Sequence, residues 1–149
     1  MSEESVKIKQ KAPWHLWTVG VVSLLWNAVG AMDYVMTQTR NEAYMNAFTP
    51  EQLEFFYGLP GWTVAAWAIA VWGGVLGSIL LLVRMRHAVG VFAVSLLAMI
   101  VTSFQNFVLS NGLEVMNDHF SLGISALIFL VSIALVVYAR AMYQRGVLV

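Results

Sequence analysis

The sequence predicts an all-α protein, an integral membrane four-helix bundle with antiparallel up-down topology and short amphipathic helices in its first outer loop. Hydrophobic residues make up 60% of the chain and charged residues 11%, whereas a soluble domain has about 45–50% and about 25%. The apolar residues gather in four stretches, at about 14–36, 60–83, 88–110 and 120–139. Each stretch is near or above the roughly 20 residues that a helix needs to cross a bilayer.

The basic residues predict how these crossings are oriented. We expect residues 1–149 to form a single membrane domain, with tails at 1–13 and 140–149 and an outer loop at 37–59. Cytoplasmic segments of membrane proteins carry an excess of Lys and Arg, so both termini are expected in the cytoplasm. Seven of the eight basic residues fall on that side, namely Lys7, Lys9, Lys11, Arg84, Arg86, Arg140 and Arg145.

The first outer loop carries signals for two short helices. Thr39-x-x-Glu42 and Thr49-x-x-Gln52 both fit the capping box, in which the first and fourth residues bond to each other's backbone N–H. They predict helices at about 40–47 and 50–57. The apolar faces of these helices either rest on the lipid interface or fold over the outer mouth of the bundle.

Small and polar residues recur at steps of three and four along every crossing. Lipid removes the hydrophobic drive between membrane helices, so close packing of small residues and interhelical hydrogen bonds must hold the bundle. The four stripes are Gly20, Ser23, Asn27, Gly30 and Tyr34; Thr63, Ala66, Ala70, Gly73 and Gly77; Ser95, Ala98, Thr102 and Gln105; and Ser121, Ser125, Ile128 and Ser132.

Two polar residues in the first crossing each admit two interpretations. Asn27, near its middle, is either a substrate-binding amide or an interhelical hydrogen-bonding group, because its amide cannot face lipid unpaired. Asp33, nearer the outer end, is either a proton or cation site or a carboxylate that reaches headgroup water or pairs with Arg40.

Several polar and aromatic residues are predicted to converge on one outward-opening pocket. Such a lining suits neutral hydroxylated ligands, because indole faces stack on sugar-like rings. The candidate substrate-binding residues are Trp26, Asn27, Asp33, Thr63, Trp67, Thr102, Gln105 and Asn106.

No catalytic, metal or cofactor site is predicted. The chain has no cysteine, and His15, His87 and His119 fall near different membrane edges. No paired acid and base or known catalytic motif is present, so we expect that the protein is not an enzyme. The net charge of zero gives no reason to expect nucleic acid as a partner.

Five runs of residues are distinctive: Leu25–Tyr34, Thr37–Arg40, Phe48–Gln52, Pro60–Trp62 and Trp67–Gly74. In these runs the chain resembles small four-helix proteobacterial inner-membrane proteins described as uncharacterised or as "sugar transporter". The resemblance covers about residues 13–140. It implies a location in the bacterial inner membrane and sugar transport, and it assigns no catalytic role to any residue.

Two functions follow as hypotheses. The first is a small transporter of sugars or similar small neutral solutes, acting as a homo-oligomer because four short helices enclose little volume. The alternative is a non-catalytic accessory or assembly subunit that binds another membrane protein through the outer helices. The lipid bilayer is the surrounding partner in both cases.

Overall fold

The computed structural model describes residues 9–115 and 118–149. Its four long helices are α1 (Trp14–Gln38), α4 (Gly61–Leu82), α5 (His87–Phe104) and α7 (His119–Gln144), and α5 continues as a π-helical segment, η1 (Gln105–Leu109). The described residues contain no strand, so the predicted all-α class is confirmed. With η1 added to α5, all four helices are long and apolar enough to cross a membrane, which makes the chain a multi-pass membrane protein.

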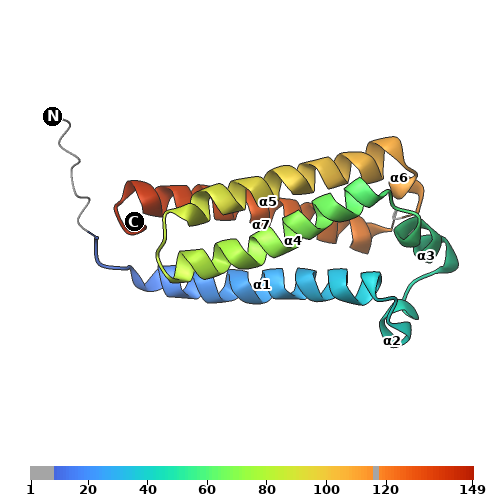
Figure 1. The fold of residues 1–149 in the computed structure, drawn as a ribbon, viewed down its shortest axis with the longest axis horizontal. Helices are drawn as coiled ribbons and strands as arrows, with labels where there is room; N and C mark the ends of the chain where they lie inside the picture. The colour runs from blue at the N-terminus through green and yellow to red at the C-terminus, as the bar shows by residue number, and fades with distance from the viewer. Residues whose placement is uncertain (1–8, 116–117) are drawn as a thin grey trace.

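The long helices lie side by side and alternate in direction, as predicted (Figure 1). Helix α4 packs between α1 and α5, and α7 packs against α5. Helix α1 begins at the same end of the bundle at which α7 finishes (Figure 1). At this end His15 Nδ1 lies 2.6 Å from the hydroxyl of Tyr138, which joins α1 to α7.

The glycines of α4 let it approach both neighbours closely. A side chain at Gly74 would meet Asn27 of α1, and one at Gly73 would lie 3.0 Å from Ser95 Cβ of α5. Ser95 in turn donates a hydrogen bond of 2.5 Å to the carbonyl of Ala70. The predicted stripes of α1, α4 and α5 therefore hold these three helices together through small residues and hydrogen bonds.

The end of the bundle where α7 finishes contains the packed core. In chain order, the cluster contains Leu16, Leu81, Ala88, Phe92, Leu135, Ala139, Met142, Val147 and Leu148. Three of these residues, Met142, Val147 and Leu148, come from the segment that the sequence assigns to a tail. Helix α7 continues to Gln144, beyond the predicted crossing, and the chain then folds back onto the α4–α5 turn.

Hydrogen bonds hold the folded-back segment in place. Arg84 Nε donates to the carbonyl of Val147 at 3.1 Å. The backbone N–H of Val149 donates to Arg84, and the backbone N–H of Arg86 donates to Val149. The side chain of Arg84 also donates to the carbonyl of Gln10. The turn and both terminal segments thus close this end of the bundle.

The opposite end carries the short helices α2 (Glu42–Met45), α3 (Pro50–Tyr57) and α6 (Gly112–Val115). The capping box of Thr49 and Gln52 is present at the start of α3, as predicted. The box predicted at Thr39 is wrong, because α1 runs to Gln38 and the Thr39 hydroxyl donates back to the carbonyl of Val35. Asn41 caps α2 instead.

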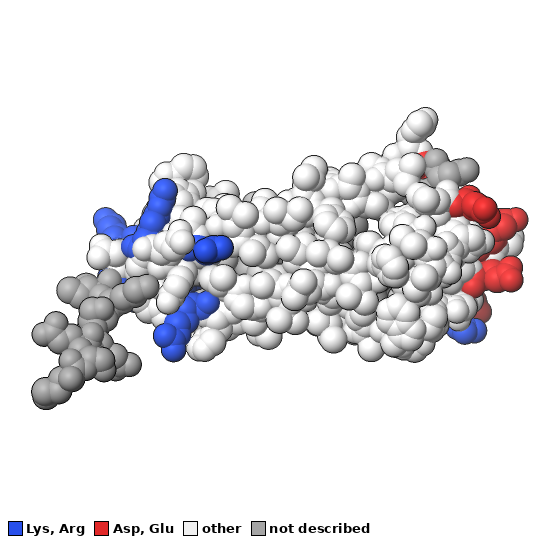
Figure 2. Space-filling model, turned by 90° about the horizontal axis from the view of Figure 1, so that it is seen from above, with Lys and Arg blue, Asp and Glu red and all other residues white. Residues whose placement is uncertain are grey.

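Charges of opposite sign lie at the two ends of the bundle (Figure 2). The basic end has the core described above and includes Lys9, Lys11, Arg84, Arg86, Arg140 and Arg145. The acidic end has the short helices and includes Glu42, Glu51, Glu54, Glu114 and Asp118. Arg40 is the one basic residue of the outer loop, and its guanidinium lies 4.2 Å from the centre of the Tyr57 ring.

Candidate functional site

A cavity of about 290 Å³ lies among the helices in the acidic-end half of the bundle. We call it the interhelical cavity. All four long helices and the first outer loop contribute to its wall. The lining residues are Asp33, Phe48, Phe56, Leu59, Trp67, Thr102, Asn106, Phe120, Ser121, Ile124 and Ser125.

Helices α1 and α7 are joined at the basic end by His15 and Tyr138, and toward the acidic end both helices line the interhelical cavity. Asp33 of α1 and Ser121 and Ser125 of α7 line the same space. Many side chains on the acidic-end half of α7 are exposed; Phe120, for example, is 77% exposed.

Aromatic residues of the outer loop cover part of this space. Phe48 and Phe56 both line the cavity, and their ring centres lie 5.5 Å apart in an edge-to-face contact. The Tyr44 ring lies 5.8 Å from Phe48. Residues of both outer helices thus lie against the acidic end of the bundle, since Tyr44 of α2 bonds to Asp33 and Phe56 of α3 lines the cavity.

Asp33 is the only carboxylate within the four membrane helices. Its Oδ1 accepts a hydrogen bond from the hydroxyl of Tyr44, which links α1 to α2. Among the described residues no donor reaches Oδ2. Burial and this hydrogen bond with Asp33 raise the pKa of Tyr44 to about 12, so the phenol stays a donor at neutral pH. The expected alternative partner, Arg40, stacks on Tyr57 instead.

Four of the eight predicted site residues line the interhelical cavity: Asp33, Trp67, Thr102 and Asn106. Trp67 is also held edge-on by Tyr34, with ring centres 5.0 Å apart. The hydroxyl of Thr102 donates to the carbonyl of Ala98, which leaves its oxygen free to accept a further hydrogen bond. These residues bring a charge, an amide, a hydroxyl and an indole to one space.

Asn27 does not line the cavity. Its amide donates to the carbonyl of Ser23 and, at 3.3 Å, to the hydroxyl of Ser78 on α4. Asp33 lies six positions after Asn27, and at 3.6 residues per turn their side chains point roughly 120° apart. One therefore faces α4 and the other faces the cavity, and Asn27 makes an interhelical hydrogen bond, which is one of the two interpretations that the sequence left open.

The remaining three predicted residues are also absent from the cavity lining. Gln105 is buried and donates to Ser110 at 3.0 Å. Thr63 is fully buried, and its hydroxyl has no hydrogen-bond partner among the described residues. Trp26 is half-buried in α1.

The π-helical segment η1 places Asn106 at the cavity. Segments of this kind occur often at functional sites, because the wider turn redirects side chains. The Oδ1 atom of Asn106 is buried and lacks a partner among the described residues. Gly112 of α6 packs directly on the backbone carbonyl of Asn106, where a larger residue has no room.

Sequence reasoning missed most of the apolar and hydroxyl lining. Ser121 and Ser125 were assigned to a packing stripe, although in the structure they face the cavity. Ser125 donates to the carbonyl of Ser121 at 2.9 Å. Phe48 and Phe56 lie in the outer loop, where the apolar faces of the predicted helices were the available signal.

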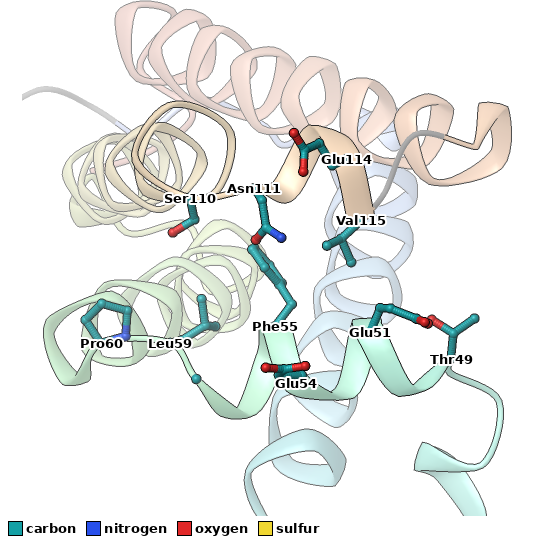
Figure 3. A pocket seen from close by; sticks show the side chains of 11 residues that line it. Thr49, Glu51, Glu54, Phe55, Leu59, Pro60, Ser110, Asn111, Glu114 and Val115 are labelled. Carbon is teal, nitrogen blue, oxygen red and sulfur yellow. The ribbon is translucent and has the colours of Figure 1, made fainter.

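A second cavity, of about 690 Å³, lies between α3 and α6 at the acidic end; we call it the α3–α6 cavity. Figure 3 shows Phe55 reaching from α3 toward Asn111. Three carboxylates, of Glu51, Glu54 and Glu114, are among the residues that line it. It contains none of the predicted site residues.

Comparisons of the chain with models of protein families, with curated proteins and with solved structures find no match. The resemblance to small inner-membrane proteins therefore stays a prediction. What bears on function is the geometry of the interhelical cavity.

Proposed function

We propose that the protein is a small-solute transporter that takes up its solute in the interhelical cavity. The observation that supports this proposal is the position of the cavity, which lies between membrane helices and has polar groups along an otherwise apolar wall. Its volume of about 290 Å³ is at the lower limit of the roughly 300–1,000 Å³ of drug-sized sites. The solute is therefore smaller than a typical drug.

Sugars are the solutes that the resemblance suggests. Trp67 supplies an indole face, and Asp33, Thr102 and Asn106 supply hydrogen-bonding groups at neighbouring positions of the wall. In this proposal the basic end lies in the cytoplasm of a bacterium, and the cavity is reached from the far side of the inner membrane.

The proposal includes assembly into a homo-oligomer. The packed core fills the half of the bundle at the basic end, and the interhelical cavity lies only in the other half. A path through the whole membrane then needs helix movement, and α7 has contacts with α5 but few with α1. A second copy beside α7 would support such a movement. The mass of the protein in lipid nanodiscs tests this part of the proposal.

Uptake by reconstituted protein tests transport directly. Purified protein in liposomes should accumulate at least one labelled sugar or other small polar solute faster than protein-free liposomes do. Thr102→Val removes a hydroxyl from the cavity wall and should lower uptake by about twofold to tenfold, the effect of one hydrogen bond. Thr18→Val makes the same change at an exposed position of α1 and is the control.

Two results would contradict the proposal. Uptake equal to that of protein-free liposomes for every solute would exclude transport under these conditions. Equal uptake by the two threonine variants would exclude the interhelical cavity as the route.

The α3–α6 cavity favours a second candidate function, that of an accessory or assembly subunit. It lies outside the membrane helices and offers carboxylates and the apolar side chains of Phe55, Leu59 and Val115 to another protein. Affinity purification in mild detergent should then recover one defined membrane partner in constant ratio. Both candidate functions treat the protein as non-enzymatic, which stays a prediction.

A further inference from the structure

We infer that the solute of the interhelical cavity is a small organic cation, such as a primary, secondary or quaternary ammonium compound. This inference rests on the proposed function and narrows its substrate class. It differs from the neutral hydroxylated ligand that the sequence alone suggests, and the reason is the charge at Asp33.

The first argument is that the carboxyl group of Asp33 has no cationic partner among the described residues. The carboxylate lines the cavity within a membrane helix, where an unpaired charge is costly. Its one hydrogen-bond partner among the described residues is the neutral phenol of Tyr44. The nearest basic residue in sequence, Arg40, is held over the ring of Tyr57. A ligand with a positive charge would supply the missing counterion.

The second argument comes from the aromatic wall. Phe48, Phe56, Trp67 and Phe120 all line the cavity that contains Asp33. The faces of aromatic rings attract ammonium groups, most strongly when the site is shielded from water. A carboxylate together with several rings is the combination that recognises an alkylammonium ion, whereas a neutral ligand would leave the carboxylate without a counterion.

The hydroxyl groups of the wall are consistent with this ligand. The hydrogens of Thr102 and Ser125 are already donated to the carbonyls of Ala98 and Ser121, so their oxygens can only accept. Together with Oδ2 of Asp33, these oxygens suit a ligand that donates hydrogen bonds or carries positive charge.

The charge at the acidic end of the bundle also favours a positively charged ligand. The carboxylates of the acidic end gather at the end of the molecule where the cavity lies (Figure 2). A surface of one sign raises the local concentration of ions of the opposite sign and their rate of association. Cations are therefore favoured both at the approach and inside the cavity.

A matched pair of ligands tests the inference. Choline and 3,3-dimethylbutan-1-ol have nearly the same shape, and only choline is charged. Their binding to the full chain in lipid nanodiscs, together with that of glucose, can be measured by calorimetry. We expect choline to bind at least about tenfold more tightly than the alcohol, as a desolvated charge pair would require.

Variants of Asp33 connect this difference to the carboxylate. Asp33→Asn keeps the shape and an acceptor for Tyr44, and it should weaken choline binding by about tenfold or more while leaving the alcohol unaffected. Asp33→Glu keeps the charge and should retain the preference for choline. Glu42→Gln removes an exposed carboxylate that lines neither cavity, so choline binding should change by less than about twofold because salt screens that charge.

The outcomes separate this inference from the proposed function. Equal binding of choline and the alcohol, or binding of glucose without choline, would overturn the cation and leave solute binding intact. An unchanged preference in Asp33→Asn would overturn the role of Asp33, provided that its melting temperature matches wild type. Absence of choline binding to folded wild-type protein would overturn the inference, and the uptake experiment would still decide on transport.

Discussion

Replacing Gly74 with Ala should separate α1 from α4. A Cβ atom at this position would lie 2.7 Å from Asn27 Cγ and closer still to its Oδ1, so Asn27 must move. Overpacking of this kind costs about 1–3 kcal/mol. Movement of Asn27 also breaks its 3.3 Å hydrogen bond to Ser78, and interhelical bonds in membranes contribute about 0.6 kcal/mol on average.

Gly90→Ala provides the matched control. Gly90 lies in α5, and a Cβ atom there would meet nothing within 4 Å. Both substitutions gain the same helix propensity, about 1 kcal/mol, so this contribution cancels in the comparison. The free energy of unfolding should therefore be lower in Gly74→Ala than in Gly90→Ala by about 2–4 kcal/mol.

Unfolding of both variants in mixed micelles, followed by tryptophan fluorescence, measures this difference. Adding Asn27→Ala to Gly74→Ala removes the colliding side chain, so the double variant should lose less stability than the sum of the two single changes. Equal stability of Gly74→Ala and Gly90→Ala would refute the reasoning. Additive effects in the double variant would show that the two residues are not in contact.

Three further changes test other parts of the structure. Leu148→Ala should lower the free energy of unfolding by about 2–5 kcal/mol, because this side chain is fully buried. Val149→Ala should lower it less, because the Val149 side chain is 38% exposed. Chemical unfolding of both variants measures the difference. Thr49→Ala should destabilise α3 by about 1 kcal/mol through loss of its cap, visible as faster hydrogen exchange in α3 without a change at the basic end. The phenol of Tyr44 has a pKa of about 12 and should therefore ionise at a higher pH than a phenol with the ordinary pKa of 10.0. The contribution of this raised pKa to the free energy of unfolding should be complete below pH 10 and lost as the pH rises through 12. The difference in phenolate absorbance between wild type and Tyr44→Phe isolates the titration of this phenol. Asp33→Asn should shift the pKa of Tyr44 toward 10.0, because Asp33 helps to raise that pKa and the amide that replaces it carries no charge.

Much of the fold could be predicted from the sequence because its signals are local. The four apolar stretches have the length of a membrane span, and the capping box at Thr49 needs only residues three positions apart. The stripes of small and polar residues on α1, α4 and α5 could also be predicted, since a helix brings every third or fourth residue to one face. The fold-back of the segment that contains Val147 and Leu148 could not be predicted, because it is stabilised by contacts with the α4–α5 turn, which is distant in sequence.

The candidate site could be predicted only in part, for a geometrical reason. Asp33, Trp67, Thr102 and Asn106 lie at similar depths and share the cavity, whereas Asn27 turns toward α4. Depth follows from counting residues, but direction depends on which neighbour each helix packs against. The sequence does not indicate that α7 lines the same cavity as α1, so the contribution of Ser121 and Ser125 could not be foreseen.

The two ends of the bundle differ because packing and polarity are distributed unequally along the same helices. At the basic end, large apolar side chains such as Leu16, Leu81 and Leu135 fill the space, and the fold-back closes it. At the acidic end, α7 supplies serines and α1 supplies a carboxylate, neither of which can fill an apolar core. A cavity at the acidic end therefore follows from the choice of side chains. A carboxyl group without a cationic partner among the described residues, placed there under aromatic side chains of the outer loop, is costly for stability alone. The cationic ligand that we propose would supply the missing partner.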